Sequence, residues 1–314
     1  MENFRRLSIA ETCRTRLGPA CLITSFFLFL AGGIAHATGL EETCRLISNK
    51  LASVSLEDCL DGGLLLSGGY SVQGTPLLMK EYPPLERRLP QARVLVIGGV
   101  HGDEYSSISI VFKWMRILDI HHSGLFHWVV IPLLNPDGLL RDASTRTNSR
   151  GVDLNRNMPS SSWREVGYQR WLDVAKCNPR YYPGPHPMSE PETEFLVNII
   201  NSFKPHAIVS VHAPLCLVDH DGPGTPAKAL GNLSLRRLGN FPGTLGNYAG
   251  VDKGIPLVTL ELPSSARLPS SGEISALWQG IVRWLIDNVP VESEPEGMWV
   301  ETERKELERE FFGK

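Results

Sequence analysis

Four apolar runs place the strongest constraint on how this chain folds. Each run is short and nearly continuous, as expected for β-strands that are covered on both faces rather than solvated on one. They are RVLVIGGV (residues 93–100), HWVVIPLL (127–134), HAIVSVHA (206–213) and IPLVTLELP (255–263). The pattern favours strands buried in the middle of an α/β domain.

Segments with helical periodicity alternate with these runs. Residues 105–119 repeat apolar side chains at helical spacing, and residues 275–289 form an amphipathic pattern. Residues 189–203 begin with Ser189 and Glu192 in the spacing of a capping box. This alternation predicts an α/β fold with a mixed, largely parallel twisted sheet that is flanked by helices.

The first 37 residues have the pattern of a secretory signal peptide. An arginine-rich start precedes the apolar stretch Ala20–Ile34, and the sequence AHA at residues 35–37 matches a cleavage site. The apolar stretch is shorter than the roughly 20 residues of a comfortable membrane span. We therefore expect cleavage after Ala37 and no stable membrane insertion afterwards, with an uncleaved anchor as the alternative.

The rest of the chain divides into three segments. Residues 38–92 have the composition of an N-terminal extension, residues 93–290 contain the α/β pattern, and residues 291–314 form a charged C-terminal tail. The formal net charge of the whole chain is −3, and the sequence contains no basic run. Because such a surface is poorly suited to nucleic acid, we expect no nucleic-acid partner.

Four cysteines remain once the signal peptide is removed: Cys44, Cys59, Cys177 and Cys216. An even number of cysteines in an oxidising compartment favours disulfides. We expect the pairs Cys44–Cys59 and Cys177–Cys216, because the first pair brackets a short segment. Buried free thiols are the alternative.

Polar residues end all four apolar runs. His101 and Glu104 follow the first run, the turn NPDG (135–138) follows the second, His212 ends the third and Glu261 ends the fourth. Ligands of open α/β sheets bind beyond the carboxyl ends of the strands, so these side chains are candidates for one site. Each also has a simpler explanation, since NPDG is favourable turn chemistry and a histidine at a strand end is often a hydrogen-bonded core residue.

Two histidines and one glutamate form the ligand set of an open catalytic zinc site. His101 and Glu104 would supply a close pair of ligands, and His212 would supply the distant third. Glu261 lies between two leucines, and burying its carboxylate without a partner would cost several kcal/mol. These residues predict a zinc-dependent amide hydrolase with one metal ion in each chain.

The motifs around these residues resemble the zinc carboxypeptidase family. The matching segments follow the family's order and are HGDE (101–104), NPDG (135–138), RTNSRGVDLNRN (146–157), SVHA (210–213) and TLELP (259–263). Within the family, IGGVHGDEYSS, GVDLNRNMP, SEPET and LGNYAG are most similar to the branch that trims peptidoglycan, the murein peptide amidases. The resemblance implies that residues 93–290 form a zinc carboxypeptidase-like catalytic domain.

The resemblance also implies roles for individual residues. The zinc ligands would be His101, Glu104 and His212. Glu261 would be the general base that activates the attacking water and later protonates the leaving amine. Arg146 would stabilise the oxyanion, and Arg150 is the alternative for that role.

A further set of residues would bind the substrate. Asn155 and Arg156 match the pair that holds the terminal carboxylate of the substrate, and a planar guanidinium suits bidentate binding of a carboxylate. An ion pair between Arg156 and Asp153 is the structural alternative. Tyr248, in LGNYAG, is a further candidate for substrate contact.

One departure from the digestive carboxypeptidases concerns the substrate. Those enzymes have an arginine between the first two ligands, whereas this chain has Gly102 and Asp103, as the peptidoglycan-directed branch does. We therefore expect a periplasmic zinc peptidase of the bacterial envelope that hydrolyses the γ-D-glutamyl–meso-diaminopimelate bond of peptidoglycan peptides. The alternatives are a carboxypeptidase for ordinary C-terminal residues, a deacylase of N-acylated amino acids, and a non-catalytic envelope-binding or zinc-storing protein.

Overall fold

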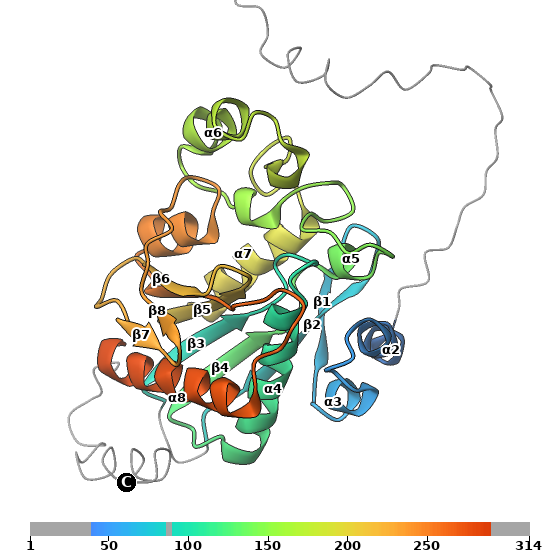
Figure 1. Cartoon of the computed structure of the whole chain (residues 1–314), viewed down its shortest axis with the longest axis vertical. Coiled ribbons are helices and arrows are strands. Elements are labelled where there is room, and N and C mark those ends of the chain that lie inside the picture. The colour runs from blue at the N-terminus through green and yellow to red at the C-terminus, as the bar shows by residue number, and fades with distance from the viewer. Residues whose placement is uncertain (1–38, 86–89, 290–314) are drawn as a thin grey trace, which may run out of the picture.

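A seven-stranded mixed sheet runs through the centre of the protein (Figure 1). The computed structural model describes residues 39–85 and 90–289, so the expected signal peptide and charged tail lie outside the described residues. The strand order is β1-β2-β4-β3-β5-β9-β6. The strands are β1 (Leu65–Tyr70), β2 (Pro76–Tyr82), β3 (Ala92–Ile97), β4 (Phe126–Ile131), β5 (Ala207–His212), β6 (Leu217–Asp221) and β9 (Leu257–Glu261), with a separate pair β7 (Ala229–Leu230) and β8 (Leu233–Ser234).

The middle of the sheet is parallel. β4, β3, β5 and β9 run parallel to one another, whereas β1, β2 and β6 pair antiparallel with their neighbours. The four apolar runs form these four central strands, and the predicted mixed, largely parallel sheet is confirmed. Because the carboxyl ends of parallel strands meet at one edge of a sheet, the polar residues that end them are brought to the same edge.

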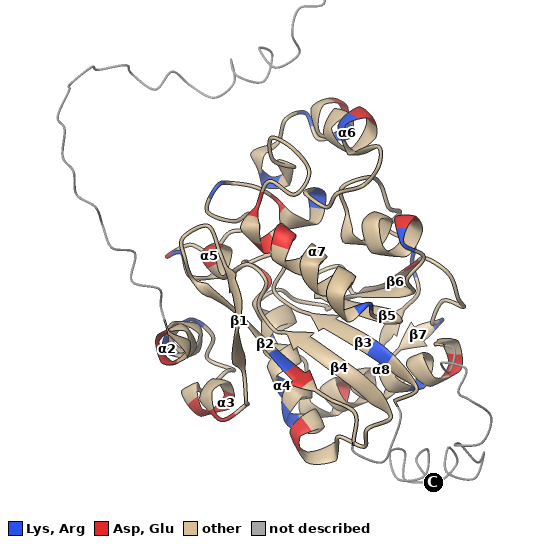
Figure 2. Ribbon diagram, turned by 180° about the vertical axis from the view of Figure 1, so that it is seen from behind, with Lys and Arg blue, Asp and Glu red and all other residues tan. Residues whose placement is uncertain are grey.

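Helices cover both faces of the sheet, as opposite views show (Figures 1 and 2). Val94 and Val96 of β3 face the core beneath α4 and α8, while Leu95 and Ile97 face the core beneath α7. The helices are α2 (Leu40–Lys50), α3 (Leu56–Leu60), α4 (Tyr105–His121), α5 (Pro136–Leu139), α6 (Gln169–Asp173), α7 (Pro191–Phe203) and α8 (Ser271–Asn288), with shorter turns η1 (Leu154–Arg156), η2 (Trp163–Tyr168), η3 (Pro179–Tyr181) and η4 (Gly246–Asp252). Among the described residues, no helix has the length and apolar character needed to cross a membrane.

The segment expected to be an N-terminal extension contributes to the main sheet. Its strand β2 pairs with β4 through contacts such as Glu81 with Val129, and β1 continues the sheet beyond β2. A disulfide between Cys44 and Cys59 joins α2 to α3, as predicted. Residues 65–82 therefore belong to the same sheet as the candidate site.

The predicted disulfide between Cys177 and Cys216 is wrong. The thiol of Cys216 is free and exposed. Cys216 directly precedes the edge strand β6, whereas Cys177 follows α6. The prediction rested on an even cysteine count, which does not say which cysteines meet in the folded protein.

The predicted capping box of α7 is also wrong. The helix begins at Pro191 after the N-cap residue Glu190, whose side chain accepts no capping hydrogen bond. Ser189 donates its hydroxyl to the Glu190 carboxylate, and Glu192 accepts hydrogen bonds from outside the helix. The motif has the spacing of a capping box, but tertiary contacts occupy its side chains.

Candidate active site

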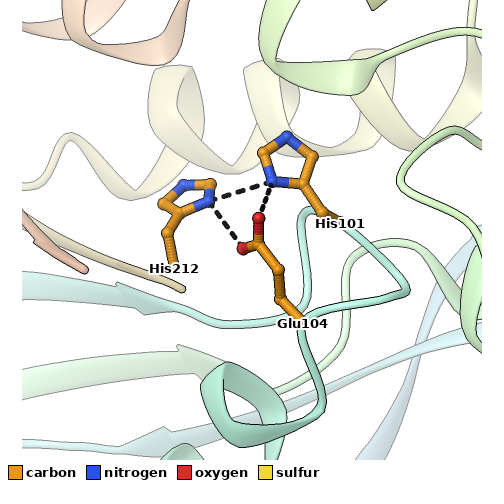
Figure 3. Close-up of side chains that lie close together, drawn as sticks. All are labelled: His101, Glu104 and His212. Atoms are coloured by element: carbon orange, nitrogen blue, oxygen red, sulfur yellow. Dashed lines mark hydrogen bonds and ion pairs between the residues drawn. The ribbon is translucent and has the colours of Figure 1, made fainter. Parts of the chain in front are cut away.

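Three predicted zinc ligands meet at the carboxyl edge of the sheet (Figure 3). His101 and Glu104 lie in the turn between β3 and α4, and His212 is the last residue of the adjacent strand β5. All three side chains are buried, and one ligand atom from each lies within 4.8 Å of the other two. We call these residues the His-Glu-His cluster.

The contacts within the cluster are direct. Oε1 of Glu104 lies 2.8 Å from Nδ1 of His101, and Oε2 lies 3.1 Å from Nδ1 of His212. The two Nδ1 atoms are 3.2 Å apart. Burial alone would raise the pKa of Glu104, but His101 and His212 outweigh it and hold that pKa well below its usual range. The carboxylate is therefore ionised and available to a cation.

The outer nitrogen of each histidine has its own partner. Nε2 of His101 lies 3.2 Å from Oδ1 of Asp153, and Nε2 of His212 lies 3.1 Å from the hydroxyl of Ser210. Such contacts fix the orientation and the tautomer of metal-binding histidines. Two Nδ1 atoms and a carboxylate then converge on one point, which is the donor chemistry that an open zinc site requires. The residues present fit a zinc ion.

Arg146 reaches the same cluster. Its Nε donates to Oδ2 of Asp153 at 2.8 Å, and its Nη1 lies 3.1 Å from Nδ1 of His101 and 3.6 Å from the Glu104 carboxylate. Burial opposes the charge of Asp153, yet Arg146 keeps the pKa of that carboxyl well below its ordinary value. Arg150 instead contacts Ser189 and Glu190, and its side chain is 55% exposed against 13% for Arg146.

Glu261 lies at the end of β9, beside the cluster. It is the register partner of His212, and its Oε2 accepts a 3.4 Å hydrogen bond from the backbone N–H of Leu215. Burial raises the pKa of Glu261, the neighbouring Glu104 carboxylate raises it further, and His212 partly opposes the shift. A buried carboxylate with limited hydrogen bonding next to a metal-ligand cluster is a candidate proton acceptor.

Asn155 and Arg156 lie on the turn η1, next to Asp153. Asn155 accepts a 2.8 Å hydrogen bond from the backbone N–H of Leu245, which fixes η1 against the start of η4 (Gly246–Asp252). The guanidinium of Arg156 lies 4.7 Å from the ring centroid of Phe241. Over the described residues, no carboxylate forms an ion pair with Arg156; Asp153 is bonded to Arg146 and acts on Arg156 only through its charge.

Tyr248, the third residue predicted to contact the substrate, lies on η4 rather than on η1. It is buried on η4 among the apolar residues that pack against α7, and its side chain is hydrogen-bonded to Asn201. Burial raises the pKa of its hydroxyl. The structure thus gives Tyr248 a position in the packed interior.

Asp103 forms an ion pair across the site. Its Oδ2 accepts a 2.7 Å hydrogen bond from Arg180, and its Oδ1 is buried without a partner in the described structure. Arg180 precedes Tyr181, whose ring lies 5.4 Å from the guanidinium of Arg146. The ion pair therefore connects the turn that carries His101 to the segment that covers Arg146.

Two contributors to the cluster were not predicted as such. Ser210 could have been found, because residues two apart on a strand point to the same face and Ser210 precedes His212 by two positions. Asp153 was considered only as a partner of Arg156. Its contact with His101 spans 52 residues and has no local sequence signal.

Comparisons with known proteins identify the family. A family model described as zinc carboxypeptidase matches residues 64–215. Murein peptide amidase A from Vibrio campbellii is 34% identical over 204 residues, which cover 63% of this chain and 78% of the relative. The chain belongs to the zinc carboxypeptidase family. Murein peptide amidase A from Escherichia coli K12 is 31% identical over 223 residues, which cover 69% of this chain and 88% of that relative. Membership in this family makes the protein a zinc metallopeptidase.

Solved structures share the fold. The murein-tripeptide amidase from Escherichia coli O157 is 26% identical and superposes with a TM-score of 0.50, covering 73% of this chain and 92% of its own. Bovine thrombin-activatable fibrinolysis inhibitor is 17% identical with a TM-score of 0.55, covering 81% of this chain and 96% of its own, and at that identity supports the fold alone.

Proposed function

We propose that this zinc metallopeptidase hydrolyses the γ-D-glutamyl–meso-diaminopimelate bond of peptidoglycan peptides in the bacterial periplasm. The observation that carries the proposal is the Glu261 carboxylate beside a buried His-Glu-His cluster, in a chain whose relatives include murein peptide amidases. The signal-peptide pattern of residues 1–37 supports export.

His101, Glu104 and His212 would hold the zinc ion. When bound there, zinc acts as a Lewis acid toward the scissile carbonyl and makes the attacking water more acidic. The contacts of Asp153 and Ser210 with the outer histidine nitrogens support this role, because they turn both Nδ1 atoms toward Glu104.

Glu261 would carry the proton between the two steps of hydrolysis. It takes a proton from water as the water oxygen bonds to the carbonyl carbon, and it returns the proton to nitrogen as the carbon–nitrogen bond breaks. Burial raises the pKa of Glu261, which favours its holding the proton between acceptance and donation. The products are a new carboxylate on the glutamyl residue and a free diaminopimelate amine.

Arg146 and Arg156 would bind negative charge on the substrate. Arg146 is close enough to the cluster to stabilise the oxyanion that develops on the scissile carbonyl, and removing one such donor typically lowers the rate about 10²–10³-fold. Arg156 lacks a carboxylate partner within the described chain, which supports a role in holding the carboxylate next to the scissile bond, with Asn155 beside it.

The substrate can be tested with a peptide panel. Zinc-loaded protein is incubated with L-Ala-γ-D-Glu-meso-diaminopimelate, with peptides that end in ordinary amino acids, and with N-acylated amino acids. Release of free diaminopimelate as the dominant reaction supports the proposal. Preferential release of an ordinary C-terminal residue would make the protein a general carboxypeptidase, and preferential deacylation would make it an amidohydrolase of a different substrate class.

A further inference from the structure

A cavity of about 280 Å³ lies between α6 and the segment that covers Arg146. Two arginines and several apolar or aromatic side chains line it, including Arg156, Arg170, Trp171, Tyr181, Pro183 and Phe241. The cavity adjoins the residues around the zinc site, because the ring of Tyr181 lies 5.9 Å from the guanidinium of Arg156 and 5.4 Å from that of Arg146. Arg170 lies outside every motif that the sequence analysis singled out.

The two arginines of the cavity lie against a single ring. The guanidinium carbon of Arg156 is 4.7 Å from the centroid of Phe241, and that of Arg170 is 4.4 Å from the same centroid. Because both guanidinium carbons lie within 4.7 Å of the same ring centroid, the two positive groups are close to each other. Burial lowers the pKa of Arg156, Asp153 partly opposes the shift, and the charges of Arg146 and Arg170 lower the pKa further.

Neither arginine of the cavity forms an ion pair with a carboxylate of the described chain, and Asp153, the carboxylate whose charge acts on Arg156, is bonded to Arg146. Like charges this close repel each other, and an anion that lies between or beside them offsets the repulsion. A guanidinium also binds carboxylates with defined, bidentate geometry. The cavity is therefore suited to a ligand that brings two negative groups.

The other side chains that line the cavity indicate what the rest of that ligand should be. Trp171, Val174 and Pro183 are apolar or aromatic. They are best matched by a short saturated chain that joins the two anionic ends of the ligand. A diamino diacid such as diaminopimelate has this form, with a carboxylate at each end of an aliphatic chain. Lysine has the same chain but lacks the second carboxylate.

We propose that Arg170 binds the distal carboxylate of the residue that is released, while Arg156 binds the carboxylate next to the scissile bond. This assignment rests on the proposed function and deepens it, because it makes the cavity selective for a substrate whose terminal residue is a diacid. Arg170 is then a specificity-determining residue that contacts the substrate without taking part in the chemistry.

The test compares two peptides that differ only in this carboxylate: L-Ala-γ-D-Glu-meso-diaminopimelate and L-Ala-γ-D-Glu-L-Lys. The steady-state constants are measured for the zinc-loaded wild type and for Arg170→Gln. Arg170 is solvent-exposed, so its hydrogen bond to a carboxylate should contribute at the low end of the range for charged hydrogen bonds. We therefore expect Arg170→Gln to lower kcat/KM for the diaminopimelate peptide about tenfold, mainly by raising KM. The rate constants for the lysine peptide should stay within about twofold of the wild type.

Arg164→Gln is the matched control, since Arg164 is an exposed arginine of η2 that does not line the cavity. It should leave both peptides unaffected. Equal losses on both peptides in Arg170→Gln, or no loss on either while the wild type is active, would overturn the assignment of Arg170 alone. Failure of the wild type to hydrolyse either peptide would overturn the proposed function and this assignment with it.

Discussion

The Cα atoms of His212 and Glu261 are register partners on the adjacent parallel strands β5 and β9. Side chains at paired positions of neighbouring strands point to the same side of the sheet. The backbone N–H of Leu262 donates to the carbonyl of His212 at 2.8 Å, so this register continues to the edge of the sheet. The strand pairing therefore holds a candidate proton acceptor next to a zinc ligand on rigid elements, rather than on mobile loops.

Asp153 should control the affinity of the site for zinc. It is fully buried between Nε2 of His101 and the guanidinium of Arg146. The substitution Asp153→Asn removes the charge that orients His101. Loss of such a partner typically lowers metal affinity about 10–100-fold. Competition titration with a zinc-binding dye measures the change, with the exposed Asp142→Asn as control. Equal zinc affinity in the wild type and Asp153→Asn would refute this role.

Removal of zinc should lower stability as well as activity. A ligand that binds only the folded state stabilises it by about 4 kcal/mol when its free concentration is about 1,000-fold above Kd. A strong chelator should therefore lower Tm and abolish hydrolysis, and added zinc should restore both. His212→Ala supplies the control, because it removes one ligand of the cluster and should show no zinc-dependent rise in Tm. A Tm that is independent of zinc in the wild type would contradict the assigned site.

Glu192 should make stability depend on pH. Burial raises its pKa from 4.5 to about 7, although the Val72 N–H and the Asn148 side chain donate to its carboxylate. Between these two values the folded protein binds more protons than the unfolded chain, so stability falls as pH rises through this window. Glu192→Gln should remove this pH dependence, so the stability of the variant relative to the wild type should improve by about 2.5 kcal/mol from pH 5 to pH 8. Urea unfolding of both proteins at the two pH values measures it, and an unchanged difference would count against the raised pKa.

The disulfide between Cys44 and Cys59 should stabilise the N-terminal helices. It closes a loop with a sequence separation of 15, for which chain entropy suggests about 3 kcal/mol. The double replacement Cys44→Ser and Cys59→Ser should lower the free energy of unfolding by about that amount. Cys216→Ser, which alters an exposed free thiol, should change it by less than about 0.5 kcal/mol. Similar stability of the two variants would show that the cross-link contributes little.

The central strands and the metal cluster could be predicted from the sequence for one physical reason. Buried parallel strands are continuous apolar runs, and their carboxyl ends share an edge, so His101, His212 and Glu261 could be placed together without a structure. The polar strand β6 and the glycine-containing strand β1 lack this signature, and neither was predicted.

Other features depended on contacts between distant segments. The ion pair of Asp153 with Arg146 replaced the considered pair with Arg156, because the fold turns Arg146 toward the cluster and Arg156 toward Phe241. The disulfide pairing of Cys216 was mispredicted because cysteine count carries no information about which loops meet. Arg170 lies in a short helix with no recognisable motif, and only the cavity reveals its relation to Arg156.

The most direct measurement of the central claim is the release of free diaminopimelate from L-Ala-γ-D-Glu-meso-diaminopimelate by the zinc-loaded wild type and by Glu261→Gln. We predict release by the wild type, and a rate lower by about 10²–10⁴-fold in the variant with an unchanged zinc content, because the variant cannot accept a proton. No release by the wild type, or undiminished release by Glu261→Gln, would contradict the account.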